Sequence, residues 1–302
     1  MAKAIKIQQG ITPLLRDYLE LCKPGVVLLM IITSLTGMFL AVPGIPPVGA
    51  LLWGNLGIAL CAGAAAAINH TMERYLDLLM NRTKGRPVAN KRISSWNAAF
   101  FAATLGTTGF GVLFLLVNPL TAYLTLLSLV GYAFIYTLYL KWATVQNVVI
   151  GGLSGAMPPL LGWTAVTNSI DAYPLILVAI IFLWNPPHFW ALALQKKKEY
   201  AKTGIPVMPV VYGDKVTRLH ITLYAILTSV VTFLPYLMQY AGSLYLGGVI
   251  LINLLWAYRV ARVWNLSIPQ APYTLFKHSI NYLGIVFLLL LLDHWFSGFF
   301  VL

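Results

Sequence analysis

Charged residues are scarce in this chain, since Asp, Glu, Lys and Arg together make up 9% of its 302 residues. Soluble domains carry roughly 25% charged residues, so the composition excludes an ordinary soluble protein. Hydrophobic residues reach 59%, and the mean hydropathy is +0.80. Because one span takes about 20 apolar residues, these values indicate a membrane protein with many spanning helices.

Cysteine is also rare, with only Cys22 and Cys61 in the chain. Disulfide frameworks and cysteine metal sites need several cysteines at characteristic spacings. We therefore predict neither a disulfide nor a cysteine metal site.

A cleavable signal peptide is another expected absence. The first 23 residues have no apolar core and carry Arg16, Asp17 and Glu20. We expect residues 1–23 to form a cytoplasmic N-terminal segment and residues 24–302 to form one polytopic domain. The lack of a long Arg- and Ser-rich transit segment favours a bacterial inner (plasma) membrane.

Acidic residues are few, with 8 Asp and Glu against 20 Lys and Arg, a net charge of +12. Such an excess can indicate nucleic-acid binding, but its distribution argues against it. With a cytoplasmic N-terminus and nine spans, all 20 basic residues fall on the inner side, and the outer loops 44–49, 168–171 and 239–242 contain none. The positive-inside rule then predicts an N-in, C-out topology and no nucleic-acid partner. The predicted spans are 24–43, 50–72, 95–117, 118–140, 146–167, 172–195, 217–238, 243–264 and 278–300.

Polar residues interrupt the apolar pattern at the end of the second predicted span. Asn69, Glu73, Asp77 and Asn81 recur every fourth residue, a spacing that places side chains on one face of a helix. Two carboxylates stacked in this way repel each other unless a cation lies between them, and oxygen ligands suit Mg²⁺. The alternative is a solvated helix end with a basic loop. Three basic residues that suit a polyanionic ligand follow at Arg82, Lys84 and Arg86.

A second group of polar residues lies near the end of the sixth predicted span. In Asn185-Pro186-Pro187, the two prolines lack a backbone N–H donor inside an apolar run. We therefore expect the helix to break or kink there, beside a cavity or packed protein. Trp184 and His188 flank these residues and are candidates for lining a pocket, although a lone membrane histidine is as often a packing residue. Four lysines follow at Lys196, Lys197, Lys198 and Lys202. They could bind phosphate or propionate groups as point charges, or at least two could snorkel to the interface.

Tyrosines form a third group. Tyr132, Tyr136 and Tyr139 have helical spacing and either line a cavity or belong to the aromatic belt at the interface. Asn147 lies near the start of the next predicted helix and could face the same cavity.

These motifs together resemble those of the intramembrane UbiA-type prenyltransferases, over about residues 15 to 300. Within that family, the second and third motifs are similar to those of the protohaem IX farnesyltransferases. The residues that carry the resemblance are Asn69, Glu73, Asp77, Arg82 and Arg86-Pro87; Asn147-Val-Val-Ile-Gly-Gly with Gly155, Pro158-Pro159 and Trp163; and Trp184, Pro186-Pro187-His188-Phe189, Tyr200 and Gly204-Ile205-Pro206.

The resemblance implies nine helices around a central cavity that opens to lipid, with cytoplasmic loops over the active site. It also implies a reaction, in which farnesyl diphosphate alkylates the 2-vinyl group of protohaem with addition of water, giving haem O and diphosphate. Mg²⁺ is the implied cofactor, and protohaem is a substrate rather than a cofactor. Haem A synthase or a terminal oxidase assembly is a candidate partner.

Particular residues take roles by this resemblance. Asn69, Glu73 and Asp77 are expected to be catalytic and to bind the metal, with Glu199 as a further metal ligand. Trp184 and His188 are expected at the haem. The expected diphosphate ligands are Arg82, Arg86, Lys196, Lys198 and Lys202, and the expected cavity or cation-stabilising residues are Tyr132, Tyr136 and Asn147.

The chain departs from the family pattern in its acidic residues. Glu73 stands where the family usually has Asp, and Asn81 and His70 stand where many relatives have a carboxylate. The second Asp-x-x-x-Asp cluster of the wider family is reduced to Glu199, with Thr203 four residues later. A second all-carboxylate metal site is therefore in doubt.

Two other functions remain open from the residues. The same scaffold could prenylate an aromatic quinone precursor or another lipid acceptor. Alternatively, the chain could bind or transport haem without catalysis, although a transporter would place charges along a two-sided pathway, and here they gather on one face.

Overall fold

The computed structural model describes residues 11–299, and all regular elements within them are helices. Eight of these helices are long and apolar enough to cross a membrane, and a bent pair near the N-terminus can supply a ninth span. The predicted all-α membrane fold with about nine spans is confirmed. The first ten residues of the predicted N-terminal segment, and residue 300 of the last predicted span, lie outside the described residues.

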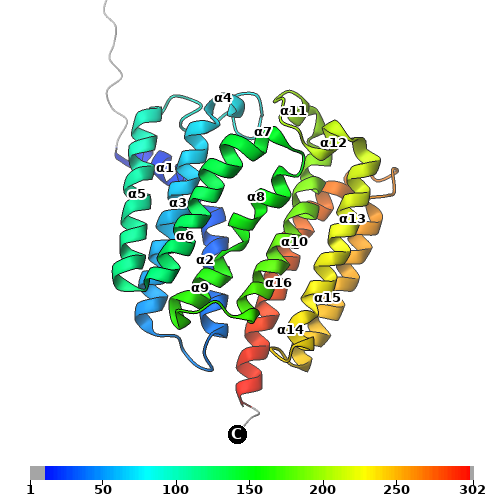
Figure 1. The fold of residues 1–302 in the computed structure, drawn as a ribbon. Coiled ribbons are helices and arrows are strands. Elements are labelled where there is room, and N and C mark those ends of the chain that lie inside the picture. Colours follow the sequence, from blue (N-terminus) through cyan, green and yellow to red (C-terminus); the bar gives the residue numbers. More distant parts are fainter. Residues whose placement is uncertain (1–10, 300–302) are drawn as a thin grey trace, which may run out of the picture.

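The spans follow the predicted order along the chain (Figure 1). The bent pair consists of α1 (Ile11–Leu21) and α2 (Pro24–Leu40), which meet at 52°. The other spans are formed by η1 (Ala50–Gly54) with α3 (Asn55–Met72); α5 (Ser95–Leu116); α6 (Pro119–Val130) with η2 (Gly131–Leu140) and α7 (Lys141–Ala143); α8 (Asn147–Ala156) with α9 (Pro158–Thr167); α10 (Ala172–Gln195); α13 (Gly213–Thr232) with α14 (Leu234–Leu237); α15 (Ser243–Arg262); and α16 (Ala271–Phe299).

The loops after the second and sixth spans meet at one end of the bundle. Three short helices, α4 (Arg74–Asp77), α11 (Lys197–Ala201) and α12 (Met208–Val211), lie there beside α7 (Figure 1). The C-terminal end of α16 lies at the opposite end. The structure therefore gathers the polar motifs on one face of the bundle, and the N-in, C-out orientation of that face remains a prediction from the basic residues.

Two glycines let α2 and α9 touch backbone to backbone. A Cβ on Gly37 would overlap the carbonyl of Pro159, and a Cβ on Gly162 would overlap the carbonyl of Ser34. Small residues allow such close contacts between membrane helices, where packing rather than water drives association. This contact holds α2, which starts directly after Lys23, against α9.

The predicted break of the helix at Asn185-Pro186-Pro187 is wrong, and the alternative of a kink stays a prediction. Helix α10 runs without interruption from Ala172 to Gln195. Both prolines are buried, α10 packs against α8, α13 and α16, and Asn185 Nδ2 donates to the carbonyl of Val148 on α8 at 3.0 Å. Packing against the neighbouring helices thus keeps α10 helical where Pro186 and Pro187 lack a backbone N–H donor.

Candidate active site

The first polar motif lies where α3 gives way to α4. Glu73 leaves the helical conformation (φ −89°, ψ 5°), but its N–H still donates to the carbonyl of Asn69, and the N–H of Asp77 donates to the carbonyl of Glu73, both at 2.9 Å. The three side chains consequently share one face, as the spacing predicts, and all are buried. Asn81 does not continue that face: it is exposed in the turns that follow α4, because the hydroxyl of Thr83 donates to the carbonyl of Asp77 and helps end the helix.

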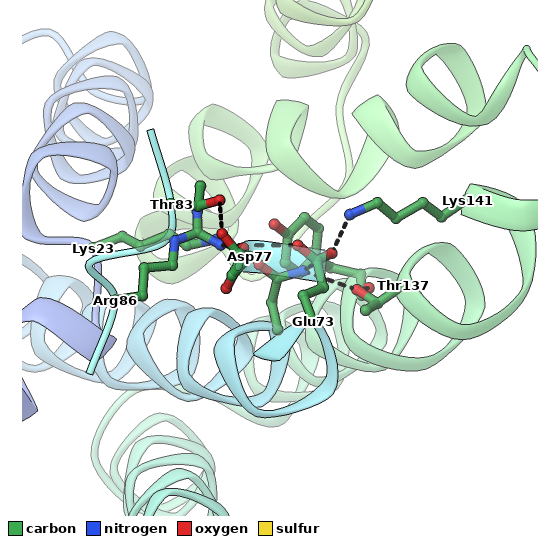
Figure 2. Close-up of polar contacts among 9 residues, drawn as sticks. Lys23, Glu73, Asp77, Thr83, Arg86, Thr137 and Lys141 are labelled. Carbon is green, nitrogen blue, oxygen red and sulfur yellow. Dashed lines mark hydrogen bonds and ion pairs between the residues drawn. The ribbon is translucent and has the colours of Figure 1, made fainter. Parts of the chain in front are cut away.

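Three basic side chains surround these acids (Figure 2). Arg86 donates to Asp77 Oδ1 at 2.7 Å. Lys141 forms an ion pair with Glu73 Oε1, and Lys23 donates to Asn69 Oδ1 at 2.7 Å. The cluster therefore joins the end of α3 to the start of α2 and to α7.

A polar cavity of about 170 Å³ opens beside this cluster. Its walls come from the loops at one end of the bundle and from the helices below them. It is lined by Lys23, Asn69, Glu73, Leu76, Asp77, Met80, Arg82, Thr83, Arg86, Tyr132, Tyr136, Lys141, Asn147, Phe189, Tyr200, Ile205 and Val207.

An apolar cavity of about 120 Å³ adjoins the polar one, and Lys23 and Tyr132 line both. It extends between α2, α3, α6 and α8, with Met30, Ile58 and Leu161 among its lining residues. A polar cavity and an apolar cavity that share two lining residues suit a ligand with an anionic head and a hydrocarbon tail.

Each carboxylate of the cluster has one oxygen that the protein holds closely, and the second oxygens differ in their surroundings. Glu73 Oε1 is held by Lys141 and by the Asn69 amide, whereas Glu73 Oε2 lies 3.9 Å from Arg86. Asp77 Oδ1 is held by Arg86, and Asp77 Oδ2 is buried without a hydrogen-bond partner. Two such oxygens fit a hard divalent cation, which Mg²⁺ sites hold through one or two carboxylates. Asn69 Oδ1 is engaged by Lys23 in this arrangement.

The two carboxylates differ in their electrostatic surroundings. Burial alone would raise the pKa of Glu73, but Lys141, together with Lys23 and Arg86, outweighs it, so the pKa lies below its ordinary value. Burial raises the pKa of Asp77 above its ordinary value, and Glu73 adds to this although Arg86 opposes it. A cation bound beside Asp77 would favour its charged form.

The structure brings most of the predicted site residues together. Arg82, Arg86, Tyr132, Tyr136 and Asn147 all line the polar cavity with the acidic cluster. Tyr132 and Tyr136 stack with ring centroids 5.4 Å apart. The amide of Asn147 donates to the carbonyls of Thr144 and Pro206, so it fastens the loop after α11 over the cavity.

The lysine-rich segment lies apart from the cavity. Lys196, Lys198 and Lys202 do not line it, and Lys198 and Lys202 are exposed. Glu199 does not line it either. Glu199 Oε1 accepts from Lys196 at 3.0 Å, and Glu199 Oε2 is buried without a hydrogen-bond partner. From this segment it is Tyr200 that reaches the cavity.

His188 and Trp184 are together, but between α10 and α16 rather than in the polar cavity. The His188 ring lies between Trp184 and Phe276, at centroid distances of 4.4 and 4.6 Å. His188 Nδ1 is 2.6 Å from the hydroxyl of Ser279, and Trp184 donates to the Ser279 carbonyl at 2.8 Å.

Sequence reasoning missed Lys23 and Lys141 as site residues. Both stand at predicted span ends, where basic residues are expected from topology alone. Lys23 has one local signal, because it is followed by Pro24 and takes a left-handed conformation (φ 51°) just before α2. From this position its side chain reaches Asn69 at the end of α3.

Comparisons with known proteins agree with this geometry. A family model described as the UbiA prenyltransferase family matches residues 30–291. A protoheme IX farnesyltransferase of Teredinibacter turnerae is 54% identical over 292 residues, covering 96% of this chain and 94% of that protein. A protoheme IX farnesyltransferase of Marinobacter nauticus is 53% identical over 279 residues, covering 92% of each.

Solved structures share the fold at low sequence identity. One, described in a study of digeranylgeranylglyceryl phosphate synthase, superposes with a TM-score of 0.79 at 18% identity, over 93% of this chain and 98% of that one. A UbiA homologue from Archaeoglobus fulgidus bound to GPP and Mg²⁺ has a TM-score of 0.68 at 15% identity, over 91% and 99%. At these identities the likeness concerns the fold.

Proposed function

The chain belongs to the UbiA prenyltransferase family, and we propose that it transfers the farnesyl group of farnesyl diphosphate to the 2-vinyl group of protohaem IX, making haem O. The relatives that are more than half identical over nearly the whole chain carry the name protoheme IX farnesyltransferase. The observation that carries the proposal is the pair of adjoining cavities, one polar and one apolar, that share Lys23 and Tyr132.

The polar cavity would hold the diphosphate. Arg82, Arg86, Lys23 and Lys141 line it and can donate to phosphate oxygens, Arg in the bidentate manner and Lys as a point charge. Lys196, Lys198 and Lys202 would act from a greater distance, by drawing the polyanion toward this face. The basic lining stabilises the charge that develops as the diphosphate leaves.

The acidic cluster would hold the metal. Glu73 and Asp77 both line the cavity; Glu73 Oε2 has only a long ion pair with Arg86, at 3.9 Å, and Asp77 Oδ2 has no hydrogen-bond partner. Asn69 could join them if Lys23 turned to the phosphate. A bound Mg²⁺ would neutralise charge on the leaving group. A solved relative of this fold was captured with GPP and Mg²⁺, which supports the choice of metal.

The apolar cavity would take the farnesyl chain. It places the tail away from the charged groups and excludes water from the allylic carbon when the diphosphate departs. Tyr132 lines both cavities, and its ring stacks on that of Tyr136, which lines the polar cavity. The faces of these rings can stabilise a carbocation by cation–π attraction.

Protohaem would be the nucleophile. The vinyl double bond supplies the electron pair for the new C–C bond to the farnesyl C1, whose bond to diphosphate oxygen breaks. The cation left next to the porphyrin ring takes up water and releases a proton, which gives the hydroxyethylfarnesyl group. His188 and Trp184, stacked between α10 and α16, are the proposed haem contacts.

The cellular setting follows from the membrane fold. The spanning helices place the enzyme in a bilayer, and we propose the bacterial inner membrane with the active-site loops in the cytoplasm. Both substrates would then meet where an apolar tail or macrocycle can enter from lipid. Haem A synthase or a terminal oxidase assembly would receive the product.

The direct test is production of haem O in cells that make none. The chain would be expressed in a bacterium deficient in haem O, and the extracted haems separated by chromatography. We expect haem O with the wild-type chain and none with Asp77→Ala, which should still insert in the membrane.

Protohaem as the sole haem, despite good expression, would refute the proposed acceptor. The same membranes assayed with an aromatic quinone precursor would then show whether the scaffold prenylates that class instead.

A further inference from the structure

Three basic side chains gather where α15 ends and α16 begins, outside the two cavities of the active site. Arg259 and Arg262 lie in the last turn of α15, and Lys277 lies near the start of α16, which packs against α15. Arg218, near the start of α13, donates to the carbonyl of Val263 at 3.0 Å, so this region lies at the same end of the bundle as α12 and the active-site loops. We call the three basic side chains the basic corner.

The basic corner has no acidic partner. The sequence contains no Asp or Glu from residue 215 to residue 292, and within residues 11–299 none of the three cations forms an ion pair. Arg259 and Arg262 instead lie 5.9 and 5.7 Å from the centroid of the Tyr258 ring. Lys277 lies 4.7 Å from the centroid of the Tyr273 ring. A ring face attracts a cation but leaves most of its N–H groups unused, so these groups can still donate to an anion.

Two buried nitrogen atoms in this region lack a partner. Arg259 Nε and His278 Nε2 have no hydrogen-bond partner, although both side chains are partly exposed, and the charge of Arg259 acts on His278. The positive-inside rule accounts for basic residues at this end of the bundle, but it does not account for buried nitrogen atoms without a partner, which cost free energy. An anion between α15 and α16 would supply the missing acceptor.

We propose that the basic corner binds the phosphate of an anionic phospholipid, in the leaflet on the side of the active-site loops. The guanidinium of Arg259 can hold a phosphate bidentately, Lys277 adds a point charge, and His278 can donate through Nε2. Basic pockets between membrane helices recognise lipid head groups in this way. Tyr258 and Tyr273 are typical of the interface, where aromatic residues lie at the level of the head groups. This lipid site goes beyond prenyl transfer and does not depend on which acceptor is used.

The surface next to the basic corner favours a lipid over a soluble anion. Leu255 and Leu251 precede Arg259 by one and two steps of four residues, so the three share one face of α15. Leu288 lies about three helical turns after Lys277, on the same face of α16. All three leucines are exposed. A phosphate at the corner, with its hydrocarbon chains along these leucines, matches the order of polar and apolar groups on this surface.

Native mass spectrometry tests the site on the full chain in detergent. The chain is titrated with phosphatidylglycerol or with phosphatidylcholine, and the bound lipids are counted. We expect the wild type to bind one phosphatidylglycerol more tightly than any phosphatidylcholine, and the variant Arg259→Gln/Lys277→Gln to bind it about tenfold more weakly. Equal binding of the two lipids by the wild type would overturn the proposal.

A matched control separates the site from the overall charge of the protein. Lys84→Gln/Lys91→Gln removes the same charge from two exposed positions in the loop after α4 and should bind phosphatidylglycerol like the wild type. An equal loss of affinity in both double variants would refute a specific site. Displacement of the bound lipid by inorganic phosphate would assign the corner to a soluble anion and overturn the proposal as well.

Thermal unfolding decides the question if the double variant does not fold. A ligand that binds the folded state raises the thermal midpoint, so phosphatidylglycerol should raise the midpoint of the wild type more than phosphatidylcholine does. The single variant Lys277→Gln, at an exposed position, should reduce this difference. The same difference in Lys277→Gln and in the wild type would remove Lys277 from the site. Because no prenyl donor or acceptor is present, these outcomes do not depend on the proposed reaction.

Discussion

The Nδ1 atom of His188 lies 2.6 Å from the hydroxyl oxygen of Ser279, and that hydroxyl donates its own hydrogen to the carbonyl of Phe276, also at 2.6 Å. With that hydrogen directed at Phe276, the Ser279 oxygen is an acceptor for Nδ1. We infer that His188 carries its proton on Nδ1 and keeps a lone pair on Nε2, the arrangement that histidine metal ligands commonly have.

This relationship predicts how haem binding responds to two substitutions. His188→Ala should reduce protohaem affinity strongly, and Ser279→Ala should reduce it about 10- to 100-fold, as is typical when a ligand loses its hydrogen-bonded support. Titration of the purified chain with haem, followed at the Soret band, measures both. His294→Ala, at the far end of α16, is the control, and wild-type affinity in His188→Ala would remove that residue from the acceptor site.

The lysine shared by the two cavities should matter for substrate binding. Lys23→Met removes a charge beside the diphosphate but keeps the length of the side chain, so we expect the KM for farnesyl diphosphate to rise about tenfold or more. Steady-state kinetics in detergent provide the measurement. Lys215→Met is the matched control, and an equal KM in both variants would contradict a phosphate contact for Lys23.

The fold could be predicted from the sequence because the bilayer leaves few alternatives. Each span must satisfy its own backbone hydrogen bonds as a helix, so apolar length alone gave 172–195, the bounds of α10. The last span was predicted to start at residue 278, whereas α16 starts at Ala271. Lys277 was predicted to end the loop before that span, but a helix can project beyond the apolar layer and carry polar residues there.

The candidate site was only partly predictable. The cluster of Asn69, Glu73 and Asp77 depends on local spacing, which the sequence displays directly. The contacts of Lys23 and Lys141 join residues 46 and 68 positions apart, and no spacing rule reveals such pairs. The pairing of Glu199 with Lys196, three residues earlier, follows helical spacing, but the position of Glu199 outside the cavity depends on how the loop folds.

A glycine pair tests the packing of the bundle. Gly162→Ala adds a Cβ that overlaps the backbone of Ser34, and overpacking of this kind costs about 1–3 kcal/mol. The thermal midpoint in detergent should fall accordingly. Gly247→Ala meets no atom within 4 Å and should leave the midpoint near that of the wild type. Equal midpoints would show that α2 and α9 can move apart without cost.

The apolar cavity should set the accepted chain length. Gly155 lines that cavity, and a Cβ added to it meets no atom within 4 Å, so Gly155→Leu should fill space without displacing a neighbour. We expect the KM for farnesyl diphosphate to rise about tenfold, and that for the shorter geranyl diphosphate to change less.

Gly111→Leu is the control, because a Cβ added to Gly111 also meets no atom within 4 Å and Gly111 does not line the cavity. Parallel changes for both substrates would place the tail elsewhere.

The two arginines of the first motif should respond differently to removal. Arg86 is committed to Asp77 at 2.7 Å, whereas Arg82 lines the cavity and forms no ion pair with any residue in the described part of the chain. It lies close to Tyr200, whose pKa is raised by burial although the Arg82 charge opposes this. Arg82→Ala should remove a contact with the substrate and raise the KM for farnesyl diphosphate about tenfold or more, with unchanged affinity for Mn²⁺, the probe of the metal site. Arg86→Ala should weaken Mn²⁺ binding as well, because it leaves Asp77 buried and unpaired.

Lys84→Ala is the control, because Lys84 is exposed and lies outside the cavity. If Arg82→Ala keeps the wild-type KM, or if Arg86→Ala keeps wild-type Mn²⁺ affinity, the corresponding assignment fails.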